Sequence, residues 1–251
     1  RRQRQMCIRD SSNTFSNFNS KYPIYADLHT HSISSGHGSE DTITDMIRCA
    51  SESGLSLFGI SDHGPATSSS AKPSYFQSLK LADRDRFGIR VLYGAELNII
   101  NTAGDVDLDD DTLSTLDYAI ISIHPPIFKP YHDKDLSSAY IRAMDHPKVR
   151  FLGHIDDARF PVDFEYLLEI AKEKHVYPEI NNGSLMPDAY RINGQENCRR
   201  ILSICKKLDL PVLLSSDSHG KKSIGNMQYI FPLLEDCLLY TSDAADDGES
   251  V

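Results

Sequence analysis

Imidazole and carboxylate side chains recur in this sequence at the points where short apolar segments end. The pair His29 and His31 follows the segment 23–28, and Glu96 closes the segment 90–96. Nine residues share this placement: His29, His31, His37, His63, Glu96, His124, His154, Asp217 and His219. Imidazoles and carboxylates together are the ligands that zinc, manganese and iron use in proteins. Nine donors exceed the needs of one ion, so two or three metals are expected, with at least one bridging carboxylate.

A histidine at the end of a strand also has an ordinary explanation, as a hydrogen-bonded core or loop residue. An H-x-H pair alone is moderate evidence, because alternate residues of a strand face the same way. Nine ligand-type residues after seven successive segments are hard to obtain by chance, which favours metal binding. His132, His146 and His175 lie away from such ends, and we predict surface or structural roles for them.

Seven short apolar segments are predicted to be the strands that position these donors. They cover 23–28, 56–61, 90–96, 117–123, 149–153, 176–180 and 211–215, and are rich in Ile, Val, Leu, Phe and Tyr. Such composition is typical of buried parallel strands. Because seven strands alternate with helical patterns, we expect βαβ units and a parallel sheet. Seven such units favour a barrel over an open sheet, although periodicity alone does not close it. The carboxyl ends of barrel strands share one rim, where barrel active sites are built.

Amphipathic segments between the strands predict the helices. In 42–53, apolar residues at Ile43, Met46, Ile47 and Ala50 form one helical face. Asp163 is a candidate N-cap for a helix over 163–174. Further helices are predicted over 74–86, 135–145, 195–208 and 226–236, and a turn or short hairpin over 101–107.

Composition limits the class of protein. The chain has 251 residues, and no apolar run approaches the roughly 18 residues of a membrane span. Its net charge is −10, which makes general binding to nucleic-acid backbones unfavourable. No secretory signal pattern is recognised, and the scattered Cys49, Cys198 and Cys205 are expected to be free thiols in a reducing compartment, so we predict a cytoplasmic protein.

Both ends of the sequence are expected to be non-native. Residues 5–11 resemble the translation of a transposon end used in DNA library preparation, and 237–242 resemble the same DNA read from the opposite strand. The alternative is a basic N-terminal and an acidic C-terminal tail. We therefore expect tails at 1–11 and 237–251 around one domain at 22–236, and without the tails the net charge is still about −9.

These motifs resemble the PHP (polymerase and histidinol phosphatase) family, and most closely its stand-alone, YcdX-type bacterial phosphatases. The likeness covers about residues 22–236 and includes H-x-H, Asp62-His63-Gly64, Glu179-Ile180-Asn181-Asn182 and Ser216-Asp217-Ser218-His219. All nine metal-ligand positions of the family are filled. One departure is the missing turn and closing helix after the last motif, so we expect the native gene to extend further and this fragment to lack its last unit.

The resemblance implies a distorted (βα)7 TIM-like barrel with a trinuclear centre of divalent ions, for which we expect zinc, with manganese or iron as alternatives. His29, His31, Glu96 and Asp217 would hold one ion. Glu96, as a bridge, would hold a second with His124 and His154. His37, His63 and His219 would hold the third.

Such a centre suits the hydrolysis of a small phosphate monoester. Our hypothesis is in-line attack by a metal-bound hydroxide, because metal lowers the pKa of bound water to about 7. Asp62 and Glu179 are candidates for orienting imidazoles, or are simply turn caps and strand-end partners. Arg159 could contact the substrate phosphate, or be a solvated loop residue.

Two other functions remain open. One is a PHP phosphodiesterase or exonuclease acting on nucleic acid. The sequence offers it no support, because it shows no basic stripe and no aromatic platform for binding a strand. The other is a non-catalytic metal-binding module. We expect a small phosphorylated substrate as the partner and no membrane, while the substrate's identity and the oligomeric state stay open.

Overall fold

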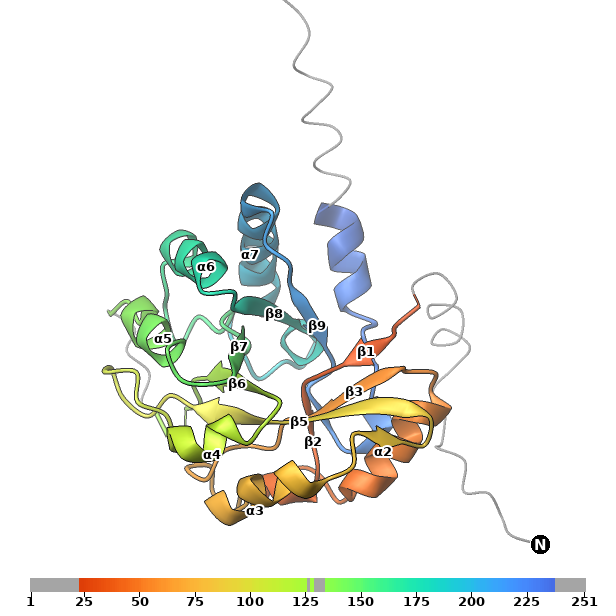
Figure 1. Ribbon diagram of the computed structural model, residues 1–251. Coiled ribbons are helices and arrows are strands. Elements are labelled where there is room, and N and C mark those ends of the chain that lie inside the picture. Colours follow the sequence, from red (N-terminus) through yellow and green to blue (C-terminus); the bar gives the residue numbers. More distant parts are fainter. Residues whose placement is uncertain (1–22, 126, 129–133, 238–251) are drawn as a thin grey trace, which may run out of the picture.

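The computed structural model describes residues 23–237, apart from 126 and 129–133. Seven parallel strands lie side by side in the order β1 (Ala26–Asp27), β3 (Leu57–Ile60), β5 (Ile89–Asn98), β6 (Tyr118–Ser122), β7 (Val149–Leu152), β8 (Tyr177–Asn181) and β9 (Leu213–Ser215). They correspond to the seven predicted segments and curve into a nearly closed barrel with helices around it (Figure 1). The predicted fold is confirmed.

The helices outside the barrel are short. They are α2 (Ile43–Glu52), α3 (Pro73–Ser78), α4 (Asp110–Ser114), α5 (Ser137–Ala143), α6 (Phe164–Glu173), α7 (Gly194–Leu208) and a last helix over 230–237. Single 3-10 turns lie at Ile33–Ser35, Leu79–Leu81, Asn182–Leu185 and Lys221–Ser223. The Asp163 side chain caps α6 by accepting from the Tyr166 N–H, as predicted. Within the described part of the chain, none of the helices is long and apolar enough to cross a bilayer.

Some predicted elements need correction. The helix expected over 74–86 ends at Leu81, because β4 (Asp85–Arg86) turns back through Phe87 and Gly88 to pair antiparallel with β5. Both turn residues have positive φ, as a two-residue hairpin turn requires. Helix α4, capped by Asp109, was not predicted. The helix expected from 226 begins at 230, while the turn at 101–107 is confirmed by the bridge between Ile99 and Val106.

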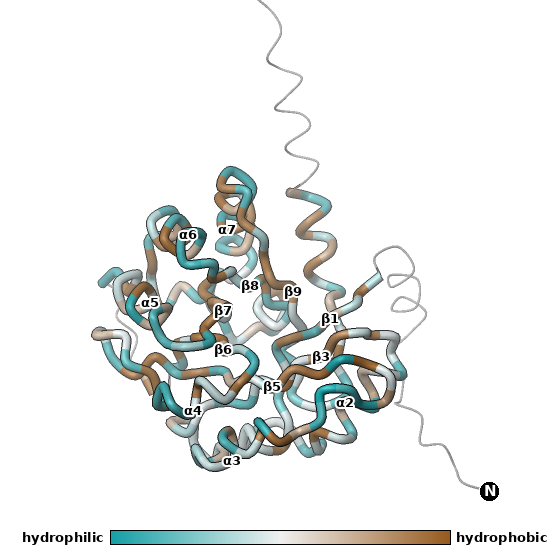
Figure 2. Tube along the Cα trace, viewed as in Figure 1, coloured by the Kyte–Doolittle hydropathy of each residue, from teal (hydrophilic) through white to brown (hydrophobic). Residues whose placement is uncertain are grey.

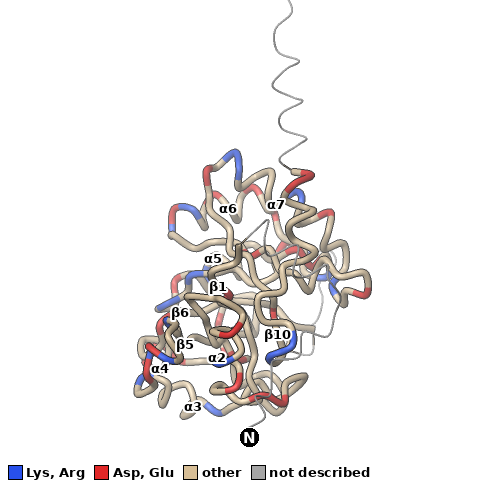
Figure 3. The backbone as a smooth tube through the Cα atoms, turned by 90° about the vertical axis from the view of Figure 1, so that its right-hand side faces the viewer, with Lys and Arg blue, Asp and Glu red and all other residues tan. Residues whose placement is uncertain are grey.

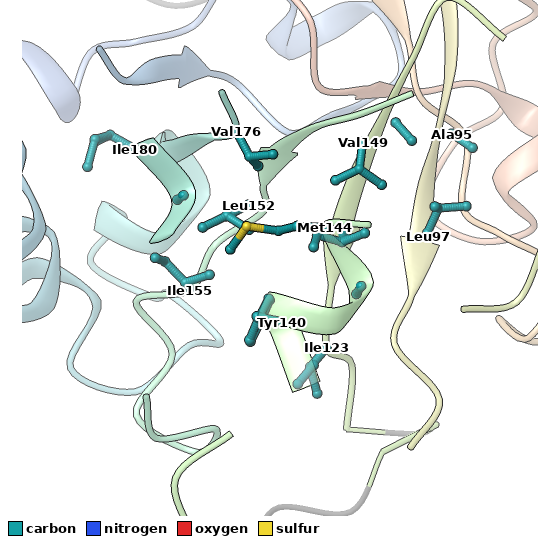
Figure 4. Close-up of a cluster of buried hydrophobic side chains, with 14 of the residues drawn as sticks. Ala95, Leu97, Ile123, Tyr140, Met144, Val149, Leu152, Ile155, Val176 and Ile180 are labelled. Carbon is teal, nitrogen blue, oxygen red and sulfur yellow. The ribbon is translucent and has the colours of Figure 1, made fainter. Parts of the chain in front are cut away.

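Alternate residues of each strand enter two different cores. Outward residues such as Phe58, Tyr93, Leu97 and Ile180 pack with the helices in the larger core, part of which Figure 4 shows between the sheet and α5. The inward residues of the smaller core come from the barrel interior: Leu28, Leu57, Leu92, Tyr118, Ile120, Phe151 and Leu213. Figure 2 shows apolar stretches along the strands and alternating apolar and polar residues along the helices.

The same inward faces become polar toward the carboxyl ends of the strands. In β5 the inward series runs from Leu92 through Gly94 to Glu96, and in β6 it runs from Ile120 to Ser122. A period of two therefore places apolar side chains at the base of the barrel and ligand-type side chains at its rim.

Two distant segments complete the barrel wall between its first and last strands. β2 (Thr30–His31) pairs parallel with β10 (Ser218–His219), which sets His31 directly beside His219. Below this pair, the buried Asp27 carboxylate accepts from the backbone N–H groups of Ser216 at 3.2 Å and Gly225 at 2.8 Å. The beginning and the end of the domain thus meet at the rim.

Candidate metal centre

The predicted ligands gather at the carboxyl ends of the strands. His29 and His31 lie at β2, Glu96 is on β5, and His63 forms a parallel bridge with Glu96. His124 and His154 follow β6 and β7, and Asp217 and His219 lie at β10. Groups of donors from these residues lie within 4.8 Å of one another: His31 with His63 and His219, His29 with His31 and Glu96, and His63 with Glu96 and His124.

Four donor atoms form the most regular group. His29 Nε2 lies 3.4 Å from Glu96 Oε2 and 3.6 Å from Asp217 Oδ1. His31 Nε2 lies 3.5 and 3.2 Å from the same two oxygens. Tetrahedral zinc with bonds of about 2.0–2.2 Å separates its ligands by about 3.3–3.6 Å, because a tetrahedron's edge is about 1.63 times its radius. The four distances from the two imidazoles to the two carboxylate oxygens therefore fall in the range expected between ligands of one cation.

The donors of this group are buried and lack hydrogen-bond partners among the described residues. The atoms concerned are His29 Nε2, His31 Nε2, Glu96 Oε2 and Asp217 Oδ1, together with His63 Nδ1 nearby. Buried polar atoms are almost always satisfied in folded proteins, and a cluster of exceptions is typical of a site that binds an ion or water. The residues present therefore fit a bound metal.

The two oxygens of Glu96 face different sets of imidazoles. Oε2 faces His29 and His31, whereas Oε1 lies 2.9 Å from His154 Nε2 and 3.3 Å from His124 Nε2. A carboxylate placed in this way can bridge two cations. This arrangement agrees with the role of Glu96 that the family resemblance implies.

A third set of rings lies on the open side of the site. The centroid of His37 is 4.8 Å from that of His63 and 5.2 Å from that of His219, and His37 is exposed. His63 also approaches Glu96, with Nδ1 2.7 Å from Oε2. Because His31 and His63 each belong to more than one donor group, the division of the nine residues among three ions remains a prediction.

Glu179 holds His29 in the tautomer that a metal ligand needs. Its Oε1 accepts from His29 Nδ1 at 2.6 Å, while Oε2 accepts from the His154 backbone N–H at 2.7 Å. With its proton on Nδ1, the neutral imidazole has its Nε2 lone pair directed at Glu96 and Asp217. Glu179 therefore lies beside an imidazole, as the sequence analysis predicted.

Asp62 acts on His31 through a serine that the sequence analysis missed. Ser35 donates its hydroxyl hydrogen to Asp62 Oδ1 at 2.7 Å, so its oxygen must accept from His31 Nδ1 at 3.0 Å. This again leaves the Nε2 lone pair free. Tyr75 of α3 and the Ser32 N–H also donate to Asp62. The serine-rich turn after His31 was the only sequence signal for this contact.

His124 is oriented by another residue that was not predicted. Its Nδ1 lies 2.7 Å from Asn98 Oδ1, and the Asn98 amide group donates to Asp107 Oδ2 at 2.6 Å. The Asn98 oxygen is therefore the acceptor, and the proton lies on His124 Nδ1. Its Nε2 consequently presents a lone pair toward Glu96.

Burial and neighbouring charges keep Glu96 and His31 in the protonation states that bind metal. Burial would raise the pKa of the Glu96 carboxyl, but the imidazoles of His124, His29 and His63 hold it well below its usual range. Burial and the neighbouring His63 and His219 hold the pKa of His31 well below its usual range. An ionised carboxylate and a neutral imidazole are the forms that bind metal.

The arginine that contacts a predicted ligand is Arg191, whereas the predicted phosphate contact was Arg159. Arg159 forms a double hydrogen bond to Asp157, and its guanidinium lies 4.1 Å from the centre of the Tyr190 ring. Arg191 donates to Asp217 Oδ2 at 2.7 Å. Nothing in the local sequence singled out Arg191, because its contact depends on the path of the loop after β8.

The remaining histidines lie apart from these groups. His146 contacts Asp110 at the start of α4, with 2.7 Å between Nδ1 and Oδ1, and His175 is exposed. His132 lies outside the described residues, as do the predicted tails apart from Cys237.

Sequence comparisons place the chain among known proteins. A protein of Clostridium acetobutylicum named as a probable phosphatase is 37% identical over 215 residues, which cover 86% of each chain. One of Vibrio campbellii with the same name is 32% identical over 212 residues, covering 84% of each chain. These matches extend beyond the metal-ligand motifs to most of the domain.

The fold has solved counterparts, and a family model matches the sequence. A histidinol phosphate phosphatase of Lactococcus lactis, solved with zinc, L-histidinol and phosphate, superimposes with a TM-score of 0.59 at 19% identity, covering 85% of this chain and 93% of that one. The model of the PHP domain matches residues 27–183, a stretch that contains seven of the nine predicted ligands. This chain therefore belongs to the PHP domain family.

Proposed function

We propose that this protein is a metal-dependent hydrolase that cleaves small phosphate monoesters. The observation that carries the proposal is the set of buried, unpartnered donor atoms of His29, His31, Glu96 and Asp217, in which each imidazole Nε2 lies 3.2–3.6 Å from both carboxylate oxygens. Three divalent ions are proposed, held by the nine residues predicted above. Zinc is the first metal to test, with manganese and iron as alternatives.

The residues of the rim have separable tasks. When bound, the ions would supply a water of lowered pKa and neutralise charge on the phosphoryl oxygens. Glu96 and Asp217 bring only two negative charges if the imidazoles bind in neutral form, so the loaded pocket stays positive and attracts a phosphate dianion. Glu179, Ser35 and Asn98 keep three imidazoles in the required tautomer. The proposal requires neither a serine nor a cysteine nucleophile.

Several observations favour a small substrate. The relatives at 37% and 32% identity are named as probable phosphatases. The chain carries a net charge of −10, and Figure 3 shows acidic and basic residues interspersed on one side of the molecule. The net negative charge and the lack of a continuous basic stripe among the described residues of this side do not favour binding of a long nucleic acid. Substrate choice is proposed to depend on the loops 64–73, 125–134, 155–162 and 183–194, with Arg159 as a candidate phosphate contact.

The test combines metal analysis with an ester panel. The full chain is stripped with a chelator, reloaded separately with Zn²⁺, Mn²⁺ or Fe²⁺, and assayed on p-nitrophenyl phosphate, its bis-ester and single-stranded DNA. We expect about three ions per chain and preferred hydrolysis of the monoester. Glu96→Gln should lose activity by about 100-fold or more, whereas Glu169→Gln, at an exposed position of α6, should behave as the wild type.

Three outcomes would contradict the proposal. Faster cleavage of the bis-ester or of DNA would favour the phosphodiesterase alternative. Full metal loading without turnover of any ester would favour a non-catalytic module. Activity that persists in the stripped protein would exclude the metal mechanism altogether.

A further inference from the structure

The two oxygens of the Asp217 carboxylate have different surroundings. Oδ1 faces the imidazoles of His29 and His31 at 3.6 and 3.2 Å and has no hydrogen-bond partner among the described residues. Oδ2 accepts from Arg191 at 2.7 Å and from Asn181 Nδ2 at 3.0 Å. Only one oxygen of this predicted ligand is therefore available to a cation, because the other already has two donors.

Arg191 is itself held on more than one side. A second guanidinium nitrogen, NH1, donates to Asn181 Oδ1 and to Ser184 Oγ, both at 3.2 Å. Asn181 ends β8, Ser184 lies in the turn after it, and Asp217 follows β9. The guanidinium thus ties the ends of two neighbouring strands together, and its fork geometry suits several simultaneous contacts.

The charge of Arg191 is shared between two buried acids. Its side chain is 16% exposed and that of Asp217 is 9% exposed. Burial opposes the charge of Arg191, but Asp217 and the fully buried Asp156 outweigh this effect and raise its pKa. A neutral side chain at position 191 would leave both acids without this counter-charge.

Asp217 also has a backbone conformation that needs support. Its φ is +53°, in the left-handed region that residues other than glycine seldom adopt. Such a conformation persists where the surroundings hold it, and the contacts to Arg191 and Asn181 supply side-chain support on the protein side of the carboxylate.

We propose that Arg191 is a positioning residue for the metal centre, which holds Asp217 Oδ2 so that Oδ1 alone is presented to the cation beside His29 and His31. The inference rests on the proposed metal centre and does not depend on the reaction catalysed there. It assigns to the loop after β8 a direct part in metal binding, in addition to any contact with substrate.

The test compares Arg191→Gln and Arg191→Lys with Arg200→Gln. Arg200 lies on α7 and pairs with Glu165 at 3.0 Å, both side chains being more than half exposed, so it serves as a matched control. Metal affinity is measured by competition with a chelator, and the visible absorption of the Co²⁺-loaded protein reports ligand geometry. We expect Arg191→Gln to weaken binding of one ion by about 10–100-fold and to change the Co²⁺ spectrum. Arg191→Lys should fall between Arg191→Gln and the wild type, because an ammonium keeps the charge but not the fork.

Two results would overturn the assignment. One is wild-type affinity with an unchanged Co²⁺ spectrum in Arg191→Gln. If that variant does not fold, the same result in Arg191→Lys overturns the assignment. Since affinity and spectrum need no turnover, the outcome is separate from that of the ester panel: an inactive protein that binds metal through Arg191-supported Asp217 would leave this inference intact.

Discussion

At the scale of single residues, the site is defined by hydrogen bonds on the far side of each imidazole. His29, His31 and His124 each direct Nδ1 at an acceptor that the surrounding bonds identify: Glu179, Ser35 and Asn98. In the neutral imidazole, each Nε2 then carries the lone pair on the side of Glu96. The ligand form is therefore set by residues that need not touch the metal.

Replacing Glu179 tests this principle. Glu179 accepts on both oxygens, from His29 Nδ1 on one and from the His154 N–H on the other. In Glu179→Gln one of these donors would face an amide NH₂ group, so we expect metal affinity to fall by about 10–100-fold. Chelator competition measures the change, with Glu169→Gln as the exposed control. An affinity equal to that of the wild type would show that the tautomer of His29 is fixed by other means.

At the scale of elements, the alternation of side chains along the strands builds both the base and the rim of the barrel. Below the rim, the interior is filled by the Tyr118 ring of β6, whose hydroxyl donates to the Leu28 carbonyl at 2.5 Å. Room for this ring comes from β3, where a Cβ on Gly59 would lie 2.3 Å from the Tyr118 hydroxyl and 2.9 Å from Leu28 Cα. Glycine at this position is therefore required by packing and not by a turn.

A double-mutant cycle should reveal this packing. Gly59→Ala is expected to reduce the free energy of unfolding by about 1–3 kcal/mol through overpacking. Tyr118→Phe should cost about 1 kcal/mol through the lost hydrogen bond. Because Tyr118→Phe also removes the closest clashing atom, the double variant should lose less stability than the sum of the two single variants in urea unfolding. Strict additivity would mean that the backbone contact at Leu28 causes the whole effect.

At the scale of the whole molecule, the rim joins segments from both ends of the domain. His29 and His31 lie near its start and Asp217 and His219 near its end. The β2–β10 pairing, the Asp27 contacts and the contacts of Asp41 with Lys221 join the two ends. A cation bound by His29, His31 and Asp217 would bind the folded chain and not the unfolded one, so its binding energy adds to stability.

Removal of metal should therefore lower the midpoint of thermal unfolding. A free metal concentration of 1,000 times the Kd contributes about 4 kcal/mol for one site. For a domain of this size that corresponds to about 8–16 °C, at roughly 2–4 °C per kcal/mol. Calorimetry with and without chelator measures the shift, and Glu96→Gln should show much less of it. An unchanged midpoint in the wild type would contradict a metal site that links the two ends of the barrel.

The sequence by itself determined the seven strands, their parallel barrel and the grouping of the nine donors at one rim. These inferences succeed because strand periodicity and the position of a residue relative to a strand end are local properties. The β4 hairpin was missed although it is also a local feature. It depends on a positive φ at Phe87, which the residue type alone does not predict.

Only the tertiary structure decided which side chains hydrogen-bond to the predicted ligands and to the residues that orient them. The contacts of Arg191 with Asp217, of Ser35 with Asp62, and of Asn98 with His124 join loops whose paths no local pattern specifies. The same holds for the β2–β10 pairing, which brings together residues almost 190 positions apart. The position of a strand along the chain follows from sequence periodicity, whereas the direction of a side chain from a loop depends on everything packed around that loop.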